Sequence, residues 1–178
     1  MTSSRLERIK GIICDGLGAI KDTAYPGTST ETYRTNIKTV RRGLIAGATS
    51  PGELPLACVD YSEWEIDTRP ENRTDDFRVF DLIAVFHIHG YYGGSTQSVP
   101  GIVYTPAESV GHAFLHDVSR WLLWNAVTYR NDADADDKWM IDHRSFKFKT
   151  IIGDTNLNEG RFQITFAVKV NTTTPDLM

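Results

Sequence analysis

The stretch TPAESVGHAFLHDVSRWLLWNAVTY, residues Thr105–Tyr129, predicts the central helix of the fold. Thr105 is a suitable N-cap, Pro106 fits the first helical turn, and Glu108 completes a capping box. Apolar residues then recur at the three- and four-residue spacing of one helix face. The members of this stripe and its flanks are Val110, Phe114, Trp121 and Leu122, with Ala113, Val118 and Trp124 beside them.

The opposite side of this helix is also partly apolar, because Leu115, Leu123 and Ala126 lie there. A helix that is apolar on more than one side is usually buried on more than one side. We therefore expect one face to pack on the sheet of its own chain and the other to contact a neighbouring subunit. The residues predicted for this subunit interface are Leu115, Leu123, His112, His116, Tyr91 and Tyr92.

The segments around the central helix predict one further helix and five strands. The helix is expected at residues 4–22, and the strands at 37–45, 56–67, 77–92, 139–152 and 162–170. This order, α-β-β-β-α-β-β, predicts an α+β fold in which two helices cover one largely antiparallel or mixed sheet. The 178 residues fit a single domain. Extended loops are expected at about 68–76, 93–104 and 131–138.

Two of these elements carry a more specific expectation. The strand at 77–92 is apolar on its even-numbered face and also at the centre of its odd-numbered face, which predicts a position inside the sheet or beneath an assembly partner. The first helix contains Gly11, Gly16 and Gly18, which weaken it intrinsically. We interpret these glycines as positions where the helix closely approaches the sheet.

Composition and charge exclude several classes of protein. The net charge of −4 argues against a general nucleic-acid-binding protein, which normally carries a basic surplus. The first residues lack the apolar core of a signal peptide, and no apolar run approaches the ~20 residues that cross a bilayer. A soluble protein made in a cytoplasm is therefore expected. Cys14 and Cys58 belong to no metal-binding motif, and buried free thiols are favoured over a disulfide.

Two histidine pairs are the candidate metal ligands. His87 and His89 share one face of a predicted strand, while His112 and His116 lie one turn apart on the central helix. Together they would bind zinc or another transition metal if the loop between them brought the pairs together. No acidic residue accompanies either pair in a known metal motif, so surface or interface histidines are the favoured interpretation and no metal is expected.

An acidic run after the central helix resembles the start of a calcium-binding loop. Asp132, Asp134 and Asp136 have the spacing of its first ligands. Asp137 stands where the loop needs glycine, and His143 stands where it needs a bidentate glutamate. A solvated acidic loop is therefore the favoured interpretation.

No recognised catalytic motif is present. The chain lacks the Gly-x-Ser-x-Gly elbow, a phosphate-binding loop and a dinucleotide fingerprint. Asp117, on the apolar side of the central helix, is either a perturbed carboxylate or, more commonly for such a position, an acceptor of hydrogen bonds from backbone or from Arg120. We expect neither enzymatic activity nor a cofactor.

The order of elements and several segments resemble the tail terminator, or tail completion, proteins of long-tailed bacteriophages. The first segment is Leu54-Pro55-Leu56, which leads into an acidic strand ending Glu63-Trp64-Glu65. The others are the strand Val79–Gly90, the helix with Asp117-Val-Ser-Arg-Trp121, and the final pair Phe146–Ile152 and Arg161–Asn171. The resemblance covers most of the chain.

This resemblance implies a structural virion protein, made in the host cytoplasm, that forms a hexameric ring. The ring would cap the tail tube, end its polymerisation and join it to the head connector, with the tail sheath as a further candidate partner. DNA would pass through the lumen without specific binding, repelled by the acidic loop residues Asp132, Asp134, Asp136 and Asp137. Two alternatives stay open: another neck, connector or minor tail protein, and a small metal-binding enzyme or ligand-binding domain that uses the histidine pairs.

Overall fold

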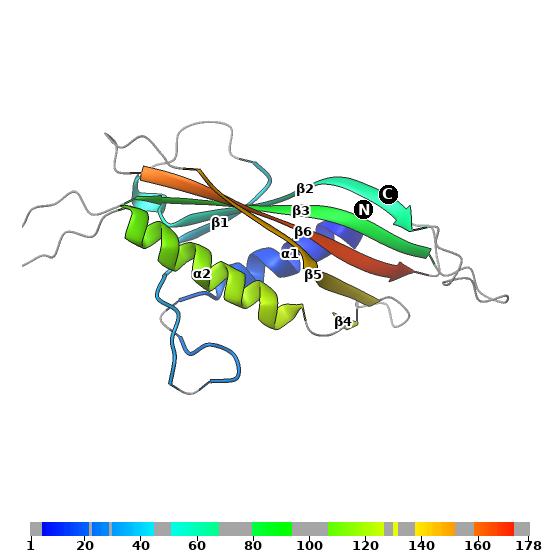
Figure 1. The fold of residues 1–178 in the computed structure, drawn as a ribbon, viewed down its shortest axis with the longest axis horizontal. Helices are drawn as coiled ribbons and strands as arrows, with labels where there is room; N and C mark the ends of the chain where they lie inside the picture. The colour runs from blue at the N-terminus through cyan, green and yellow to red at the C-terminus, as the bar shows by residue number, and fades with distance from the viewer. Residues whose placement is uncertain are drawn as a thin grey trace, which may run out of the picture.

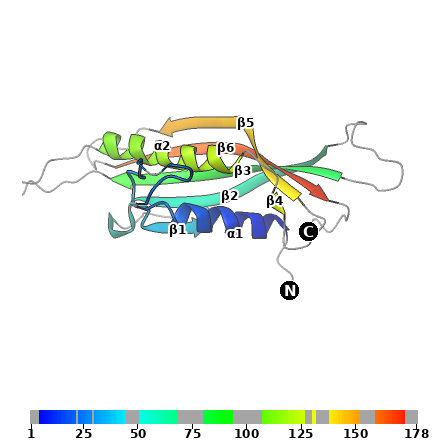
Figure 2. The ribbon, with the colours of Figure 1, turned by 90° about the horizontal axis from the view of Figure 1, so that it is seen from below.

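A computed structural model describes residues 5–21, 23–28, 30–44, 51–67, 80–93, 107–126, 130–131, 138–151 and 159–172. It confirms the α+β class and the expected order of main elements. The two helices, α1 (Arg5–Gly18) and α2 (Ala107–Asn125), lie on the same face of one mixed sheet (Figure 1 and Figure 2). The strands are β1 (Thr39–Arg42), β2 (Leu56–Asp67), β3 (Phe80–Gly93), β4 (Arg130–Asn131), β5 (Lys138–Ile151) and β6 (Glu159–Thr172).

The strands are arranged in the order β1-β2-β3-β6-β5-β4. β1 runs parallel to β2, and every other neighbouring pair is antiparallel. β3 and β6 form the centre of the sheet and pair from Phe80↔Thr172 to Gly93↔Glu159. α1 packs against β1 and β2, while α2 packs against β3, β6 and β5. The short strand β4 was not predicted, because two residues give no periodic signal.

The main core lies between the helices and the sheet. On β3 and β6 the even-numbered residues point into it, as side chains alternate between the faces of a strand. These fully buried residues are Ala84, Phe86, Ile88, Phe162, Ile164, Phe166, Val168 and Val170. The odd-numbered residues of β3 from Ile83 to Tyr91 are only half-buried. β3 is therefore central, as predicted, but its odd-numbered face is not fully covered within this chain.

Of the three glycines of α1, Gly16 faces α2, while Gly11 and Gly18 face residues of β1. A Cβ atom at Gly16 would meet the ring of Trp121 at 2.0 Å, so the missing side chain lets the two helices approach. Gly11 faces the guanidinium of Arg42, and Gly18 has Val40 as its nearest neighbour at 3.9 Å. The prediction that these glycines serve close approach to the sheet is wrong for Gly16, because the indole of α2 occupies that space.

Several expectations are resolved by the described residues. Cys14 and Cys58 are both buried and free, as predicted. Both helices are shorter than predicted, since α1 ends at Gly18 and α2 at Asn125. The predicted caps Thr105 and Pro106 lie outside the described residues, as do residues 68–76, 94–104 and 132–137, which include nearly all of the three expected loops.

Candidate interaction surfaces

The predicted interface residues of α2 lie toward or at the surface. His112 and His116 are exposed, and 49% of Leu123 is accessible to solvent. Leu115 is half-buried and packs against the main core. Tyr91 is half-buried on the opposite face of the sheet, where it packs against Leu54, Leu56 and Cys58. α2 thus leaves apolar and histidine side chains outside the core of its own chain.

The prediction that Tyr92 belongs to the subunit interface is wrong, because its side chain lies in the core. It is 6% exposed, and its ring lies 6.4 Å from that of Phe162 in a stacked arrangement. Cβ atoms placed on Gly111 and Gly160 would meet the Tyr92 ring at 2.3 and 2.5 Å. These two glycines create the space in which the tyrosine is buried, so Tyr92 is not a surface residue.

Asp117 is fully buried and anchors the segment between α1 and β1 to α2. Its Oδ2 accepts hydrogen bonds from the backbone amides of Arg34, at 2.8 Å, and Thr35, at 2.7 Å. Its Oδ1 accepts a hydrogen bond from the hydroxyl of Tyr25 at 2.5 Å. A buried carboxylate needs such donors, because an unpaired one is costly to desolvate. The donated hydrogen bonds confirm the structural interpretation of Asp117.

Arg120 does not pair with Asp117. Its guanidinium instead bonds Glu31 at 2.6 Å and lies 3.9 Å from the centre of the Tyr25 ring. Burial, together with the hydrogen bond to Asp117, raises the pKa of Tyr25 to about 12. The phenol therefore stays protonated and keeps donating its hydrogen at physiological pH. This cluster holds a loop in place and offers no group poised for proton transfer.

The second histidine pair lies on the open face of the sheet, away from the helices. His87 Nε2 is 2.6 Å from Ser62 Oγ, and its Nδ1 is 3.1 Å from Thr165 Oγ1. The rings of His87 and His89 are 6.2 Å apart. Burial, and then the neighbouring His87, lowers the pKa of His89. The result is a polar network across three strands.

The sheet separates the two histidine pairs, so they do not form a four-ligand site. His87 and His89 lie on the open face, whereas His112 and His116 belong to α2 on the other face. Among the residues that the structure describes, no three or more His, Cys, Asp or Glu side chains gather as a metal site. The predicted calcium-like residues Asp132, Asp134, Asp136 and Asp137 lie outside the described residues.

The described residues provide little for nucleophilic catalysis. The Ser62–His87 contact lacks a carboxylate on Nδ1, where Thr165 and Gln163 lie instead, so the third member of a catalytic triad is missing there. Burial raises the pKa of the Cys58 thiol to about 11, which leaves little thiolate at neutral pH. These groups have the contacts of structural residues.

One open pocket of about 320 Å³ lies where α2 begins. Its lining comes from the segment before β1, from Pro55 and from α2. The lining residues are Arg34, Thr35, Asn36, Lys38, Pro55, Ser109, Val110 and Ala113. None of these is a carboxylate or a histidine, so the pocket brings no acid–base pair together.

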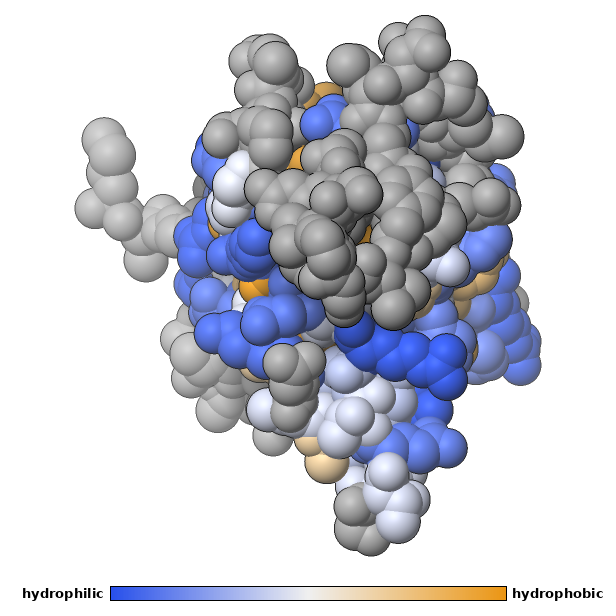
Figure 3. All heavy atoms as spheres, turned by 90° about the vertical axis from the view of Figure 1, so that its left-hand side faces the viewer, coloured by the Kyte–Doolittle hydropathy of each residue, from blue (hydrophilic) through white to orange (hydrophobic). Residues whose placement is uncertain are grey.

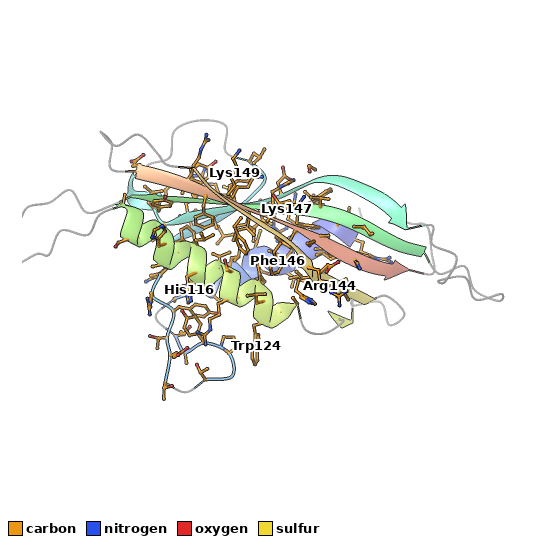
Figure 4. The ribbon with its side chains drawn as sticks, viewed as in Figure 1. His116, Trp124, Arg144, Phe146, Lys147 and Lys149 are labelled. Carbon is orange, nitrogen blue, oxygen red and sulfur yellow. The ribbon has the colours of Figure 1, made fainter. Side chains whose placement is uncertain are left out.

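A bulge in β5 exposes a basic and aromatic segment. The pairing with β6 shifts between Asp142 and Lys147, so residues 143–146 oppose the single residue Phe166. Arg144, Lys147 and Lys149 are exposed along the strand (Figure 4). Phe148 is 50% exposed and pairs with the core residue Ile164. Sequence reasoning treated this alternation only as a strand signal, although its charge pattern was already visible.

The large exposed hydrophobic side chains fall on two sides of the molecule. Leu123 of α2 and Phe148 of β5 lie toward the side where β5 forms the sheet edge, whereas the ring of Trp124 lies against Gly27, in the segment between α1 and β1. Ile12 of α1 and Leu44, directly after β1, lie on the side where β1 and β2 form the other edge. By contrast, the described residues seen end-on from the left of Figure 1 are mostly hydrophilic (Figure 3).

Comparisons with known proteins leave these surfaces as the main evidence on function. None of the helices in the described part of the chain is both long and apolar enough to span a membrane. No protein-family model matches the sequence, and a search of curated proteins finds no match either.

Proposed function

We propose that this protein is a structural assembly protein that forms a closed ring, and that the ring is the tail terminator of a long-tailed phage. The observation that carries the proposal is the exposure of Leu123 and Phe148, whose side chains are 49% and 50% accessible to solvent. Exposed apolar side chains that form a contiguous patch mark sites of interaction with other proteins. Their position beside a sheet edge that is paired over only part of its length favours contact with another subunit.

The proposed ring is also supported by exposed apolar side chains on two different sides of the subunit. Ile12 and Leu44 lie near the β1 edge, opposite the side that carries Leu123 and Phe148. Contacts between two unlike patches are heterologous, and they generate a ring when the rotation between subunits closes. A cyclic assembly is what a cap on a tail tube requires. The same ring would suit another neck or connector protein. Binding to the tail tube protein distinguishes the terminator from these alternatives.

The proposal also assigns the lining of the ring's lumen to four acidic residues, Asp132, Asp134, Asp136 and Asp137. Negative charge there would let DNA pass without adhesion. Changing all four to asparagine should slow particle assembly or DNA passage and leave the subunit folded. Unchanged infectivity of particles that carry the variant would remove this part of the proposal.

The deciding experiment is the mass of the purified protein by multi-angle light scattering or native mass spectrometry, over a range of concentrations and with tail tube protein added. A ring of six, alone or on the tube, is expected. Leu123→Glu should weaken the ring, because it places a charge in an apolar contact. Lys21→Gln on the exposed α1–β1 connection is the matched control, because it changes the net charge by the same single unit.

Two outcomes would contradict the proposal. A protein that stays monomeric in the presence of tube protein would not be a terminator. Stoichiometric metal retained through purification, and lost in His87→Ala, would instead support the metal-binding enzyme or ligand-binding domain. The separation of the histidine pairs by the sheet makes that second outcome the less expected one.

A further inference from the structure

In the part of the chain that the structure describes, both edges of the sheet are paired over only part of their length. β1 pairs with β2 only from Leu56 to Val59, and β4 pairs with β5 only at Lys138 and Trp139. Within the described ranges, no strand pairs with the outer edge of residues 60–67 or of residues 140–151. Such edges present unpaired backbone N–H and C=O groups to any further strand.

The two uncovered segments carry opposite charge. Residues 60–67 of β2 contain four acidic residues and no basic one, namely Asp60, Glu63, Glu65 and Asp67. Residues 140–151 of β5 contain Arg144, Lys147 and Lys149, all exposed. Their single acidic residue, Asp142, is paired with Lys169 at 3.2 Å. One edge is therefore acidic and the other basic.

The directions of the strands are compatible with a continuous sheet. β2, β3, β6 and β5 alternate in direction, so β2 and β5 of one chain run antiparallel to each other. A second copy placed beside the first with the same face upward would bring its β2 antiparallel to β5. Asp60 and Lys147 lie at the same level of the sheet, because one row of paired residues connects them across the strands. The pairs are Asp60↔His87, His87↔Thr165 and Thr165↔Lys147. A stagger of a few residues, as tilted strands in a closed barrel require, brings residues 63–67 opposite 144–149.

We propose that the basic outer edge of β5, residues 140–151, pairs with the acidic outer edge of β2, residues 60–67, in a second copy of this chain. The sheet then continues from subunit to subunit around the ring, and this inference rests on the proposed ring. The apolar side chains fit the same arrangement. Phe148 and Leu123 on one side of a chain would meet Ile12 and Leu44 on the other side of its neighbour.

The bulge and the lysines restrict which strand the edge accepts. Bulges and edge lysines normally protect a sheet from indiscriminate pairing. The bulge at 143–146 interrupts the regular strand, and Lys147 and Lys149 repel basic segments. An acidic strand neutralises these charges, so the same features that exclude other partners select the β2 edge of another copy.

Charge reversal tests the pairing directly. Lys147→Glu/Lys149→Glu makes both edges acidic. Glu63→Lys/Glu65→Lys brings residues 60–67 to a net charge of zero and places lysines opposite the lysines of β5. Each variant alone should weaken ring formation by at least about tenfold in dissociation constant, since like charges then face each other. Mixing the two should restore the ring, with the variants alternating, and native mass spectrometry would show equal numbers of each. A chain with all four changes should form a ring by itself.

Lys21→Glu/Lys38→Glu is the matched control, because it reverses two exposed lysines outside residues 60–67 and 140–151 and gives the same net charge as the β5 variant. It should assemble as the unmodified protein does. Circular dichroism and the midpoint of thermal unfolding verify that each variant is folded. If the β2 variant does not fold, hydrogen exchange of the unmodified protein decides instead. The amides among residues 147–151 that point away from β6 should be protected in the ring and exchange faster in the monomer.

The outcomes separate this inference from the proposed function. Three results would overturn the edge pairing and leave the proposed ring unaffected. They are a ring that forms equally well in the charge-reversed variants, a mixture of the two variants that forms no ring, and β5 amides that exchange equally fast in ring and monomer. A protein that is monomeric with tube protein present would overturn both. Restoration only on mixing supports the pairing specifically, because general changes in charge or stability do not produce it.

Discussion

The Oγ atom of Ser145 lies 2.7 Å from the backbone nitrogen of Ala167 and accepts its hydrogen. The same hydroxyl donates to the carbonyl oxygen of Asp142 at 2.6 Å. Ser145 thus replaces the strand acceptor that Ala167 loses where the bulge interrupts pairing between β5 and β6. A side chain, and not the backbone ladder, closes the sheet at this point.

Ser145→Ala should therefore destabilise the protein by about 1–3 kcal/mol, because it leaves a backbone donor without its acceptor. Urea unfolding gives the free energy, and hydrogen exchange should show faster exchange of the Ala167 amide. Ser119→Ala is the control: Ser119 only donates to the Leu115 carbonyl within α2, so its loss should cost less. Equal effects of the two substitutions would contradict the role assigned to Ser145.

Tyr25→Phe should lower the free energy of unfolding by about 1.5–3 kcal/mol, the range for hydrogen bonds to charged groups. The substitution removes the 2.5 Å hydrogen bond to Asp117 and leaves a buried carboxylate with one donor fewer. Tyr91→Phe removes a phenol hydroxyl from a half-buried site and provides the comparison in the same urea titration. If both variants were equally stable, the Tyr25–Asp117 contact would not be a stabilising anchor.

The same tyrosine predicts a loss of stability at alkaline pH. Burial, and next the hydrogen bond to Asp117, raises the pKa of Tyr25 from 10.0 to about 12. The unfolded chain therefore loses this proton first, and the stabilisation is complete below pH 10 and decreases as the pH rises toward 12. The difference in unfolding free energy between the unmodified protein and Tyr25→Phe should shrink over this interval. A constant difference would mean that the phenol pKa is not raised.

Gly16→Ala should destabilise the protein by about 1–3 kcal/mol, the usual cost of forcing extra volume into a packed core. Alanine is intrinsically the better helix residue, but its Cβ would meet Trp121 at 2.0 Å. Gly18→Ala is the matched change in the same helix, where the nearest atom lies at 3.9 Å. It should leave stability unchanged or raise it by up to about 1 kcal/mol. Thermal unfolding of both variants decides whether close helix approach or helix propensity dominates.

The sequence was sufficient for the order and type of the main elements, because their hydrophobic periods are long. The bounds of β2, 56–67, were predicted without error. The order of strands in the sheet was not accessible, since pairing depends on contacts across the chain. For the same reason the sequence indicated only the kind of group that donates hydrogen bonds to Asp117, and not which residues supply them. The burial of Tyr92 was missed because the space for its ring comes from Gly111 and Gly160, far away in sequence.

The candidate surface was predicted in part. Leu123 was found from its position outside the main apolar stripe, and the structure leaves it exposed. Phe148 and the opposite charges of the two sheet edges were missed. Charge along a strand acquires meaning only when the neighbours of that strand are known, and here the short strands β1 and β4 define which parts stay unpaired.

The central pairing of β3 with β6 also has a consequence for the rate of folding. β2 with β3 and β5 with β6 join neighbours along the chain, whereas Phe86 and Phe166, whose rings stack 5.9 Å apart, are distant in sequence. Closing so long a loop is entropically costly before any contact compensates for it, which places such topologies among slow folders, on the order of milliseconds to seconds. Until that step, each pair of strands exposes a long inner edge as well as its outer one. New chains would then compete between completing their own sheet and pairing with one another, so the yield of native protein should fall as the concentration during refolding rises.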